Sequence, residues 1–354
     1  MTARTPLALA CASLLATACA SLSPDFRSLP VVEERYVTER SPRDNVDSMS
    51  VWTNPQGRAW LLATAKETDR IIVYDAANGR ELSRQGESGA ALGQLRRPNG
   101  IFVSGDLAFV VERDNRRVQV FRLPGFEPVM QFGGTELRYP YGLWIRELGD
   151  GRRDVYVTDA YEAPDEGVPP LPELGERVKV YRVEAGNDGA LEARYLRSFG
   201  DTGKLGALRI VESLWGDVAA GRLLVAEEDE SYGSELKVYD LDGRFTGTIA
   251  GREQFVHQAE GIALWTCPDG SGWWIATDQH GSANRWHLFD RRSLAHVASF
   301  RGRVTNTTDG IWLHQGTLPG FPGGAMFASH ADAAVSAFDW RDVARVAGIP
   351  DRCP

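Results

Sequence analysis

Polar and charged residues occupy two equivalent positions in six successive segments of this 354-residue chain, and their types suit metal binding. The first position contains Asp47, Asn99, Tyr141, Glu212, Glu260 and Asp309. The second contains Lys66, Arg113, Asp159, Glu227 or Glu228, Asp278 or Gln279, and His330. Carboxylates that lie close together repel one another and are costly to bury unless a cation lies among them. The pattern therefore predicts a metal site.

Calcium is the metal that these side chains favour. It takes roughly six to eight hard oxygen ligands in a loose geometry, and the two positions offer carboxylates and amides. They offer no thiolate, which argues against zinc. Lys66 and Arg113 add positive charge suited to an anion such as phosphate. A metal and cations at one site predict phosphoester chemistry.

A strand motif that recurs six times indicates how these residues are positioned. A polar or charged residue is followed by alternating apolar positions and an aromatic residue, which is the pattern of a β-strand. The aromatic residues are Tyr74, Phe121, Tyr181, Tyr239, Phe289 and Phe338. Two further strands precede each copy and a fourth follows most of them, so the sequence predicts an all-β, six-bladed β-propeller. Its inner strands would carry both positions to one mouth of the central axis.

The sixth copy lacks an outer strand, because the residues after Phe338 have the pattern of a short helix. We expect the alternating segment from Val31 to Thr38 to close the ring as the outer strand of that last blade. The propeller domain would then span residues 31–354, after a tether at 19–30. The Pro-rich insertion from Tyr161 to Glu176 is expected to be a surface loop. Arg116 and Arg117 follow a turn and are expected on a solvated edge.

The first 18 residues have the layout of a secretory signal peptide. Residues 15–19 resemble a bacterial lipobox, so we expect Cys19 to be lipidated and the protein to be held in the periplasm or at the outer membrane. Ordinary signal-peptidase cleavage after Ala18 is the alternative. The apolar run of the signal is too short to span a membrane, and no later segment is suitable.

Cys267 and Cys353 are the cysteines left in the folded body, and the oxidising export compartment favours a disulfide between them. Two buried free thiols are the alternative. The formal charge of −9 argues against nucleic acid as a partner and against membrane contact other than through a lipid anchor. We expect a monomer that acts on a small-molecule phosphoester.

The chain resembles the β-propeller phytases, the calcium-dependent phosphatases that act on inositol hexakisphosphate. The resemblance runs from about Asp44 to Trp340. Its most specific stretches are Asp47 to Trp52, Ala63 to Lys66, Val225 to Glu230, Glu260 to Ile262, Ala276 to Gln279 and Thr308 to Ile311.

The resemblance implies roles for individual residues. Those that would hold or surround calcium are Asp47, Glu212, Glu227, Glu228, Glu260, Gln279 and Asp309, and Asn99 shares their ring. Lys66 and Arg113 would bind phosphate, with Tyr141 and His330 as further substrate-binding residues. The implied catalytic residues are Lys66, Arg113, Glu228 and Asp309, which would act with a calcium-activated water.

The third blade departs from the family pattern. Its usual Lys-Glu pair is replaced by the sequence from Thr158 to Tyr161, and His330 and Arg146 are the candidate replacements. Two other functions stay open. One is a non-catalytic binding propeller at the cell envelope. The other is a lactonase-type, metal-dependent hydrolase in which Asn99 and Glu260 bind one ion.

Overall fold

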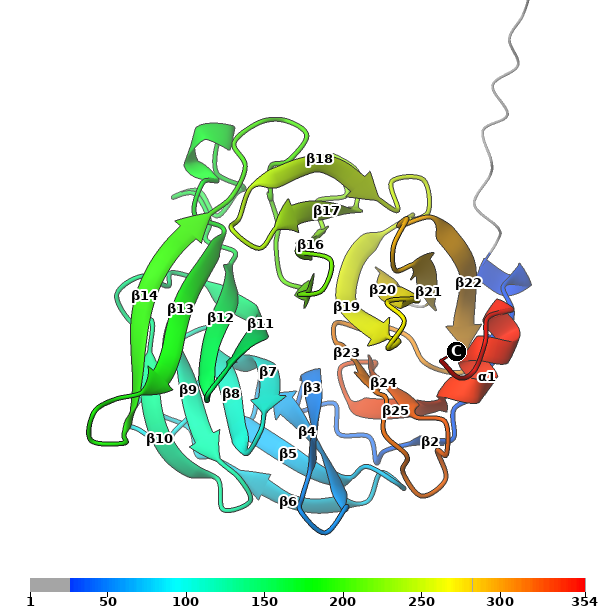
Figure 1. Ribbon diagram of the computed structural model, residues 1–354, viewed down its shortest axis with the longest axis horizontal. Coiled ribbons are helices and arrows are strands. Elements are labelled where there is room, and N and C mark those ends of the chain that lie inside the picture. Colours follow the sequence, from blue (N-terminus) through cyan, green and yellow to red (C-terminus); the bar gives the residue numbers. More distant parts are fainter. Residues whose placement is uncertain (1–25, 282, 354) are drawn as a thin grey trace, which may run out of the picture.

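The computed structural model describes residues 26–281 and 283–353, which form six β-sheets around a central axis (Figure 1). Each sheet is one blade, with its first strand nearest the axis. The predicted all-β, six-bladed β-propeller is confirmed.

Each blade is built from consecutive antiparallel strands. Blade one contains β3 (Val46–Thr53), β4 (Ala59–Ala65), β5 (Arg70–Asp75) and β6 (Glu81–Gln85). Blade two contains β7 (Pro98–Ser104), β8 (Leu107–Glu112), β9 (Arg117–Arg122) and β10 (Glu127–Phe132). Blade three contains β11 (Pro140–Gly149), β12 (Arg152–Asp159), β13 (Val178–Ala185) and β14 (Leu191–Phe199).

The second half of the ring repeats this order. Blade four contains β15 (Leu214–Asp217), β16 (Arg222–Glu227), β17 (Glu235–Asp240) and β18 (Phe245–Ala250). Blade five contains β19 (Gln258–Thr266), β20 (Gly272–His280), β21 (Ala283–Asp290) and β22 (His296–Gly302). Blade six contains β23 (Ile311–His314), β24 (Ala325–His330) and β25 (Ala334–Asp339). A 3-10 helix, η2 (Leu171–Glu173), lies in the insertion between β12 and β13.

The hydrophobic core lies between the blades. Each of six apolar clusters joins side chains of two neighbouring blades, for example Phe109 and Val118 of blade two with Val155 and Tyr181 of blade three. The middle strands are covered on both faces, so β8 and β24 are buried along their whole length. Burial between blades therefore fixes where each inner strand begins.

The N-terminal segment closes the ring, as predicted. Strand β2 (Tyr36–Val37) pairs antiparallel with β25 as the outer strand of blade six, and the Tyr36 hydroxyl donates to the Ala76 carbonyl of blade one. The closure differs in one respect from the expected single strand, since β1 (Val31–Val32) pairs parallel with β22 of blade five.

The packed chain begins before Val31. A 3-10 helix, η1 (Phe26–Ser28), precedes Leu29, which is buried against the body. These residues belong to the segment expected to be a tether. The predicted signal peptide and Cys19 lie outside the described residues.

The C-terminal segment packs on the outside of blades five and six. Helix α1 (Trp340–Ala347) begins at Asp339, which accepts a hydrogen bond from the Arg341 amide as its N-cap. Trp340 stacks on Trp265 with 3.9 Å between ring centroids. A disulfide between Cys267 and Cys353 fastens the chain beyond the helix to blade five.

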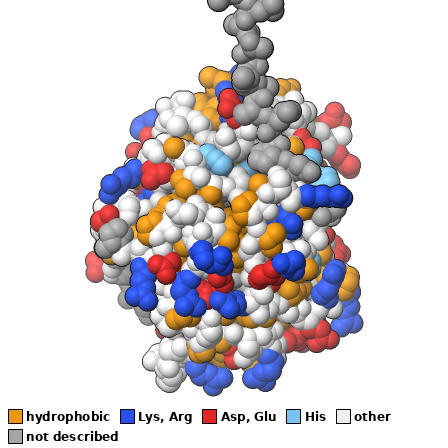
Figure 2. Space-filling view, turned by 90° about the vertical axis from the view of Figure 1, so that its right-hand side faces the viewer, with side chains coloured by type: hydrophobic (Ala, Val, Ile, Leu, Met, Phe, Trp, Pro, Cys, Tyr) orange, Lys and Arg blue, Asp and Glu red, His pale blue; other side chains and the backbone are white. Residues whose placement is uncertain are grey.

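Charges of both signs lie interspersed on the side of the molecule that carries α1 (Figure 2). Arg35 bridges Asp339 and Asp342 there, and Arg303 pairs with Glu33. This mixture is typical of a solvated surface. None of the helices in the described part has the length and apolar composition needed to cross a membrane.

Candidate metal and phosphoester site

The inner strands bring successive layers of side chains to the axis. The first layer is the predicted ring of Asp47, Asn99, Tyr141, Glu212, Glu260 and Asp309. The next residue of each strand is glycine or serine. A Cβ atom on Gly142 would lie 2.2 Å from the Glu212 carbonyl oxygen, and one on Gly261 would lie 2.6 Å from the Asp309 carbonyl oxygen. Small residues here let neighbouring inner strands approach closely, which draws the polar layer together.

Two glutamates of this layer lie close to a third, Glu228, which follows β16. Glu212, Glu228 and Glu260 each offer a carboxylate oxygen within 4.8 Å of the other two. Burial, together with repulsion from Asp47 and Asp309, raises the pKa of Glu212 to about 8. Burial and the neighbouring carboxylates raise the pKa values of Glu228 and Glu260 well above the ordinary range. The glutamates thus lie where a cation would be strongly favoured.

Lys66 supplies a positive charge at the edge of this cluster. Its ammonium nitrogen lies 2.6 Å from Asp47, 3.2 Å from Asp309 and 3.1 Å from the Tyr141 hydroxyl. Burial alone would lower the pKa of Lys66, but the two aspartates raise it above its usual value. Gln279 donates a hydrogen bond to Asp309 from the next blade. Residues of blades one, three, five and six therefore meet here.

Several polar atoms of the site lack a hydrogen-bond partner within the described chain. They are Oε1 of Glu228, Oε2 of Glu260, and both amide atoms of Asn99, which is fully buried. Buried polar atoms without a partner are costly. Oxygen ligands of this kind suit a hard divalent cation such as calcium, so the residues fit the metal that the sequence predicts.

The structure corrects the second predicted ring by one residue in blade three, and in blades four and five it favours Glu228 and Gln279 over Glu227 and Asp278. Strand β16 ends at Glu227, strand β12 at Asp159, and Asp278 occupies the matching place in β20. Their carboxylates turn away from the axis. The mouth is lined by the residues one place further on, which are Lys66, Arg113, Ala160, Glu228, Gln279 and His330.

The three carboxylates that turn away from the axis bind backbone amides, and Glu227 is the clearest example. Its carboxylate accepts hydrogen bonds from the amides of Arg209, Ile210 and Asp229, at 2.7, 3.1 and 3.1 Å. Asp159 accepts from the amides of Arg138 and Tyr139, and Asp278 from those of Val256 and His257. These acids hold the chain that enters each blade. We therefore assign Glu227 to the blade architecture in place of the metal site.

The arginine that opens the second repeat has a related role. Arg117 is buried, where it binds Glu112 and the carbonyl oxygens of Ala90, Ala91 and Gln94. The expectation that Arg117 lies on a solvated edge was wrong. A sequence that shows an arginine after a turn does not reveal the carbonyl groups that surround it.

Arg113 lies at the outer side of the mouth. Its guanidinium rests 4.7 Å from the ring centroid of Tyr139 and pairs with Asp114. It lines a groove of about 270 Å³ together with Tyr141, Arg209 and Glu212, which we call the inner groove. The inner groove therefore connects Arg113 to Glu212, one of the three clustered glutamates.

The two candidate replacements for the altered third blade are His330, in the second ring, and Arg146, on β11. His330 is buried, and its Nδ1 accepts a hydrogen bond from the Asn306 amide. Arg146 follows Tyr141 by five residues along β11, which corresponds to about 16 Å of strand away from the mouth. Arg146 therefore does not replace the missing phosphate-binding residues.

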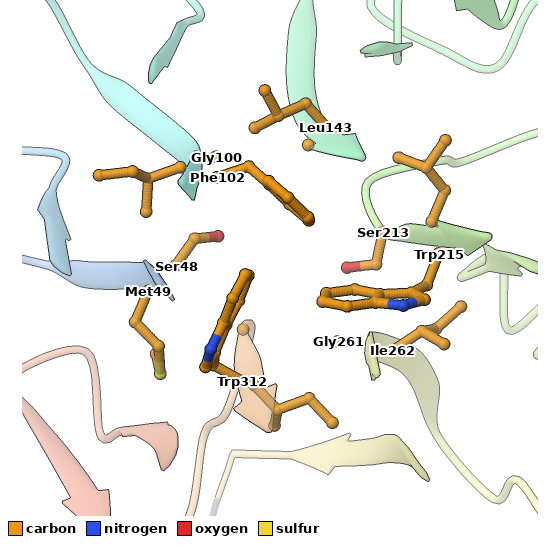
Figure 3. A pocket seen from close by; sticks show the side chains of 15 residues that line it. Ser48, Met49, Gly100, Phe102, Leu143, Ser213, Trp215, Gly261, Ile262 and Trp312 are labelled. Atoms are coloured by element: carbon orange, nitrogen blue, oxygen red, sulfur yellow. The ribbon is translucent and has the colours of Figure 1, made fainter. Parts of the chain in front are cut away.

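Aromatic side chains close the axis below the polar layers. Phe102, Trp215 and Trp312 come from alternate blades and turn toward one another (Figure 3). Their ring centroids are 5.1 to 5.5 Å apart, which leaves no room for a ligand among them. A ligand therefore reaches the glutamates from the mouth that carries Lys66 and Arg113.

The sequence of this acid-lined half of the ring can be compared with known families. Residues 174–328 match the Phytase family. The matched part of the chain contains Glu212, Glu228, Glu260, Gln279 and Asp309, whereas Lys66 and Arg113 precede it. The resemblance to β-propeller phytases that the sequence predicts is confirmed over this part.

Two solved structures are similar to this chain. A gluconolactonase from Xanthomonas campestris is 15% identical, with a TM-score of 0.51, over 87% of this chain and 97% of that one. Hydrazine synthase from Kuenenia stuttgartiensis is 11% identical, with a TM-score of 0.45, over 82% of this chain and 75% of that one. Similarity at this level to the gluconolactonase supports the propeller fold alone. Among curated proteins, no sequence matches this chain.

Proposed function

We propose that this protein is a calcium-dependent phosphomonoesterase of the phytase type, which hydrolyses inositol hexakisphosphate or a related phosphoester. One observation carries the proposal: three clustered glutamates share a mouth with Lys66 and Arg113. The Phytase match over residues 174–328 supports the same chemistry for the acidic half of the site.

Glu212, Glu228 and Glu260 would hold the metal, with Asn99, Asp47 and Asp309 around them. Calcium bound there would neutralise these acids, polarise the phosphoryl oxygens and activate water. The buried oxygens of Glu228 and Glu260 that lack partners in the described chain support this arrangement.

The chain's own cations would bind the substrate. Lys66 stays charged because Asp47 and Asp309 raise its pKa, so its ammonium can donate to a phosphoryl oxygen. Arg113 can donate from the groove side, and the Tyr141 hydroxyl lies 3.1 Å from the Lys66 ammonium. Either Glu228 or Asp309 would accept the one proton that the attacking water loses.

A phosphate-release assay with and without calcium tests the proposal. We expect phosphate release that chelation abolishes, and a loss of about 100-fold or more for Lys66→Ala, because positioned charge contributes this much to phosphoryl transfer. Arg58→Ala, a change at an exposed arginine outside the mouth, is the control and should behave as wild type. Calcium-dependent turnover that survives both Lys66→Ala and Arg113→Ala would rule out the catalytic assignment.

A lactonase-type hydrolase is the second candidate, because Asn99 and Glu260 both have buried polar atoms without a partner in the described chain. Hydrolysis of sugar lactones, with no phosphate release from any ester, would favour it. A binding propeller is the third candidate, and Ala160 at the mouth of blade three is consistent with reduced catalysis. It would retain calcium and ligand without turnover.

We also propose that the protein is exported and lipid-anchored through Cys19, and that it acts as a monomer. The support is the order of a short apolar run, small residues and cysteine at the N-terminus. Labelling with a radioactive fatty acid, and its loss in Cys19→Ala, would test the anchor.

A further inference from the structure

A second, larger cavity continues the inner groove across the face of blades three and four. It has a volume of about 510 Å³, and we call it the outer groove. Val168 and Arg209 line both cavities. A ligand with its phosphoryl group near Glu212 could therefore extend past Arg209 into the outer groove.

The outer groove has an apolar wall that is exposed to solvent. Val168, Leu205 and Tyr232 line it, with exposed fractions of 40%, 59% and 67%. Large apolar residues on a soluble protein are usually scattered singly, and a group of them beside a cavity indicates a surface that binds something apolar. Pro169 and Pro170 stiffen the same wall.

The charge of the outer groove is positive, in contrast to the protein as a whole. Its wall contains one carboxylate, Glu235, and four cations, which are Lys204, Arg209, Lys237 and Arg252. Glu235 pairs with Lys237 at 2.5 Å and with Arg252 at 2.7 Å. Lys204 and Arg209 have no ion pair within residues 26–281 and 283–353. The groove is therefore suited to an anion, although the chain carries a formal charge of −9.

Arg209 is the residue that links the two cavities. Its exposed fraction is 6%, and its guanidinium lies 3.8 Å from the ring centroid of Tyr232. None of its side-chain N–H groups has an acceptor in the described chain. Its backbone is fixed, because the amide donates to Glu227 and the carbonyl accepts from Arg177. The guanidinium nitrogens are not among the buried polar atoms without a partner, so they are open to the groove and can donate to an anion there.

We propose that the outer groove binds the leaving alcohol of an amphiphilic phosphoester, an inference that rests on the proposed phosphomonoesterase function. The phosphoryl group would lie at the glutamate cluster. A second negative charge on the alcohol would lie at Arg209 and Lys204, and an apolar segment would lie against Val168, Leu205 and Tyr232. Hydrolysis forms a bond from a water oxygen to phosphorus and breaks the bond from phosphorus to the alcohol oxygen. That oxygen takes up a proton, so the products are the free alcohol and inorganic phosphate.

Two matched phosphoesters test the inference with the full exported chain and calcium. N-octanoyl-O-phosphoserine carries the second charge and an apolar chain, whereas N-acetyl-O-phosphoserine lacks the chain. We expect kcat/KM to be about tenfold or more higher for the octanoyl ester, because partial burial of its added methylenes is sufficient for this difference. Octyl phosphate has an apolar chain without the second charge, so it should be a poorer substrate than N-octanoyl-O-phosphoserine.

Variants of the outer groove connect the preference to its wall. Leu205→Ser should reduce the octanoyl-to-acetyl ratio to below about threefold, on the scale of the buried apolar area. Lys204→Glu should instead reduce the preference for N-octanoyl-O-phosphoserine over octyl phosphate, because it removes a cation that would bind the second charge. Val304→Ser changes an exposed valine outside the groove and is the control. It should keep the substrate preferences of the wild-type protein.

The outcomes separate the inference from the function on which it rests. Calcium-dependent phosphate release at equal kcat/KM for the two phosphoserines would overturn the inference and leave the proposed function intact. A chain preference that persists in Leu205→Ser, or a preference for the second charge that persists in Lys204→Glu, would also overturn it. No release from any phosphoester would refute the proposed function, and the assignment of the groove to a leaving alcohol would fall with it.

Discussion

Glu212 and Asp309 make the stability of the metal-free protein depend on pH. Burial and neighbouring acids raise their pKa values to about 8 and about 6. The folded state therefore binds protons that the unfolded chain has already released, and stability is lost as the pH rises from about 4 to about 8. We expect the melting temperature in chelator to fall by several degrees across this range, as measured by circular dichroism.

Calcium should reverse this trend, because the cation takes the place of the protons. The increase in melting temperature caused by calcium should be larger at pH 8 than at pH 5. An increase that is independent of pH would contradict binding at the glutamate cluster.

Glu227 and Glu228 are adjacent in the sequence and should behave in opposite ways. Glu227→Gln removes a charged acceptor from three backbone amides, so we expect a loss of about 1–3 kcal/mol in unfolding free energy, with calcium affinity unchanged. Glu228→Gln relieves repulsion, so it should stabilise the metal-free protein and weaken calcium binding about tenfold or more. Denaturant unfolding and calorimetric titration measure the two effects. Equal loss of calcium binding in both variants would contradict the assignment of Glu227 to the blade.

The same pair of glutamates marks the limit of prediction from sequence. The six-fold repeat places the first-ring residues at equivalent positions, because each of them is followed directly by glycine or serine. At the second ring, two polar residues follow one another in several blades. A shift of one residue in a strand reverses the face on which a side chain lies. Glu227, Asp159 and Asp278 could be separated from the mouth residues only by their contacts with backbone amides of the incoming chain.

At the scale of elements, the glycines after the first ring control how closely the inner strands pack. Gly142→Ala would place a methyl group 2.2 Å from the Glu212 carbonyl oxygen, so neighbouring strands must separate. We expect a loss of about 2 kcal/mol or more in unfolding free energy and weaker calcium binding, since overpacking displaces backbone.

A matched glycine provides the control for that change. A Cβ atom on Gly134 would have no neighbour within 4 Å, so Gly134→Ala should change stability by no more than about 0.5 kcal/mol. Normal calcium affinity in Gly142→Ala would show that the glutamate cluster does not depend on this close approach. The sequence displays the glycines, but it does not display the carbonyl groups that require them.

At the scale of the whole molecule, the ring is a closed structure held by a short N-terminal segment. Its alternation and the missing sixth outer strand made this closure predictable. The division into β1 on blade five and β2 on blade six was not, because Val31–Val32 and Tyr36–Val37 have the same apolar pattern. Which edge each pair meets depends on the path of the chain around α1.

Thr38 offers a graded test of this closure. Its amide donates to the Val335 carbonyl at 2.9 Å, and its hydroxyl accepts from the Val335 amide at 2.9 Å. Thr38→Val removes only the acceptor, which leaves one buried amide unpaired and should cost about 1–3 kcal/mol. Thr38→Pro removes both bonds and should cost more, with an increase in aggregation as the edge of β25 becomes exposed. Denaturant unfolding and light scattering measure these effects, and a proline variant as stable and soluble as wild type would mean that the blades hold the ring together without the N-terminal segment.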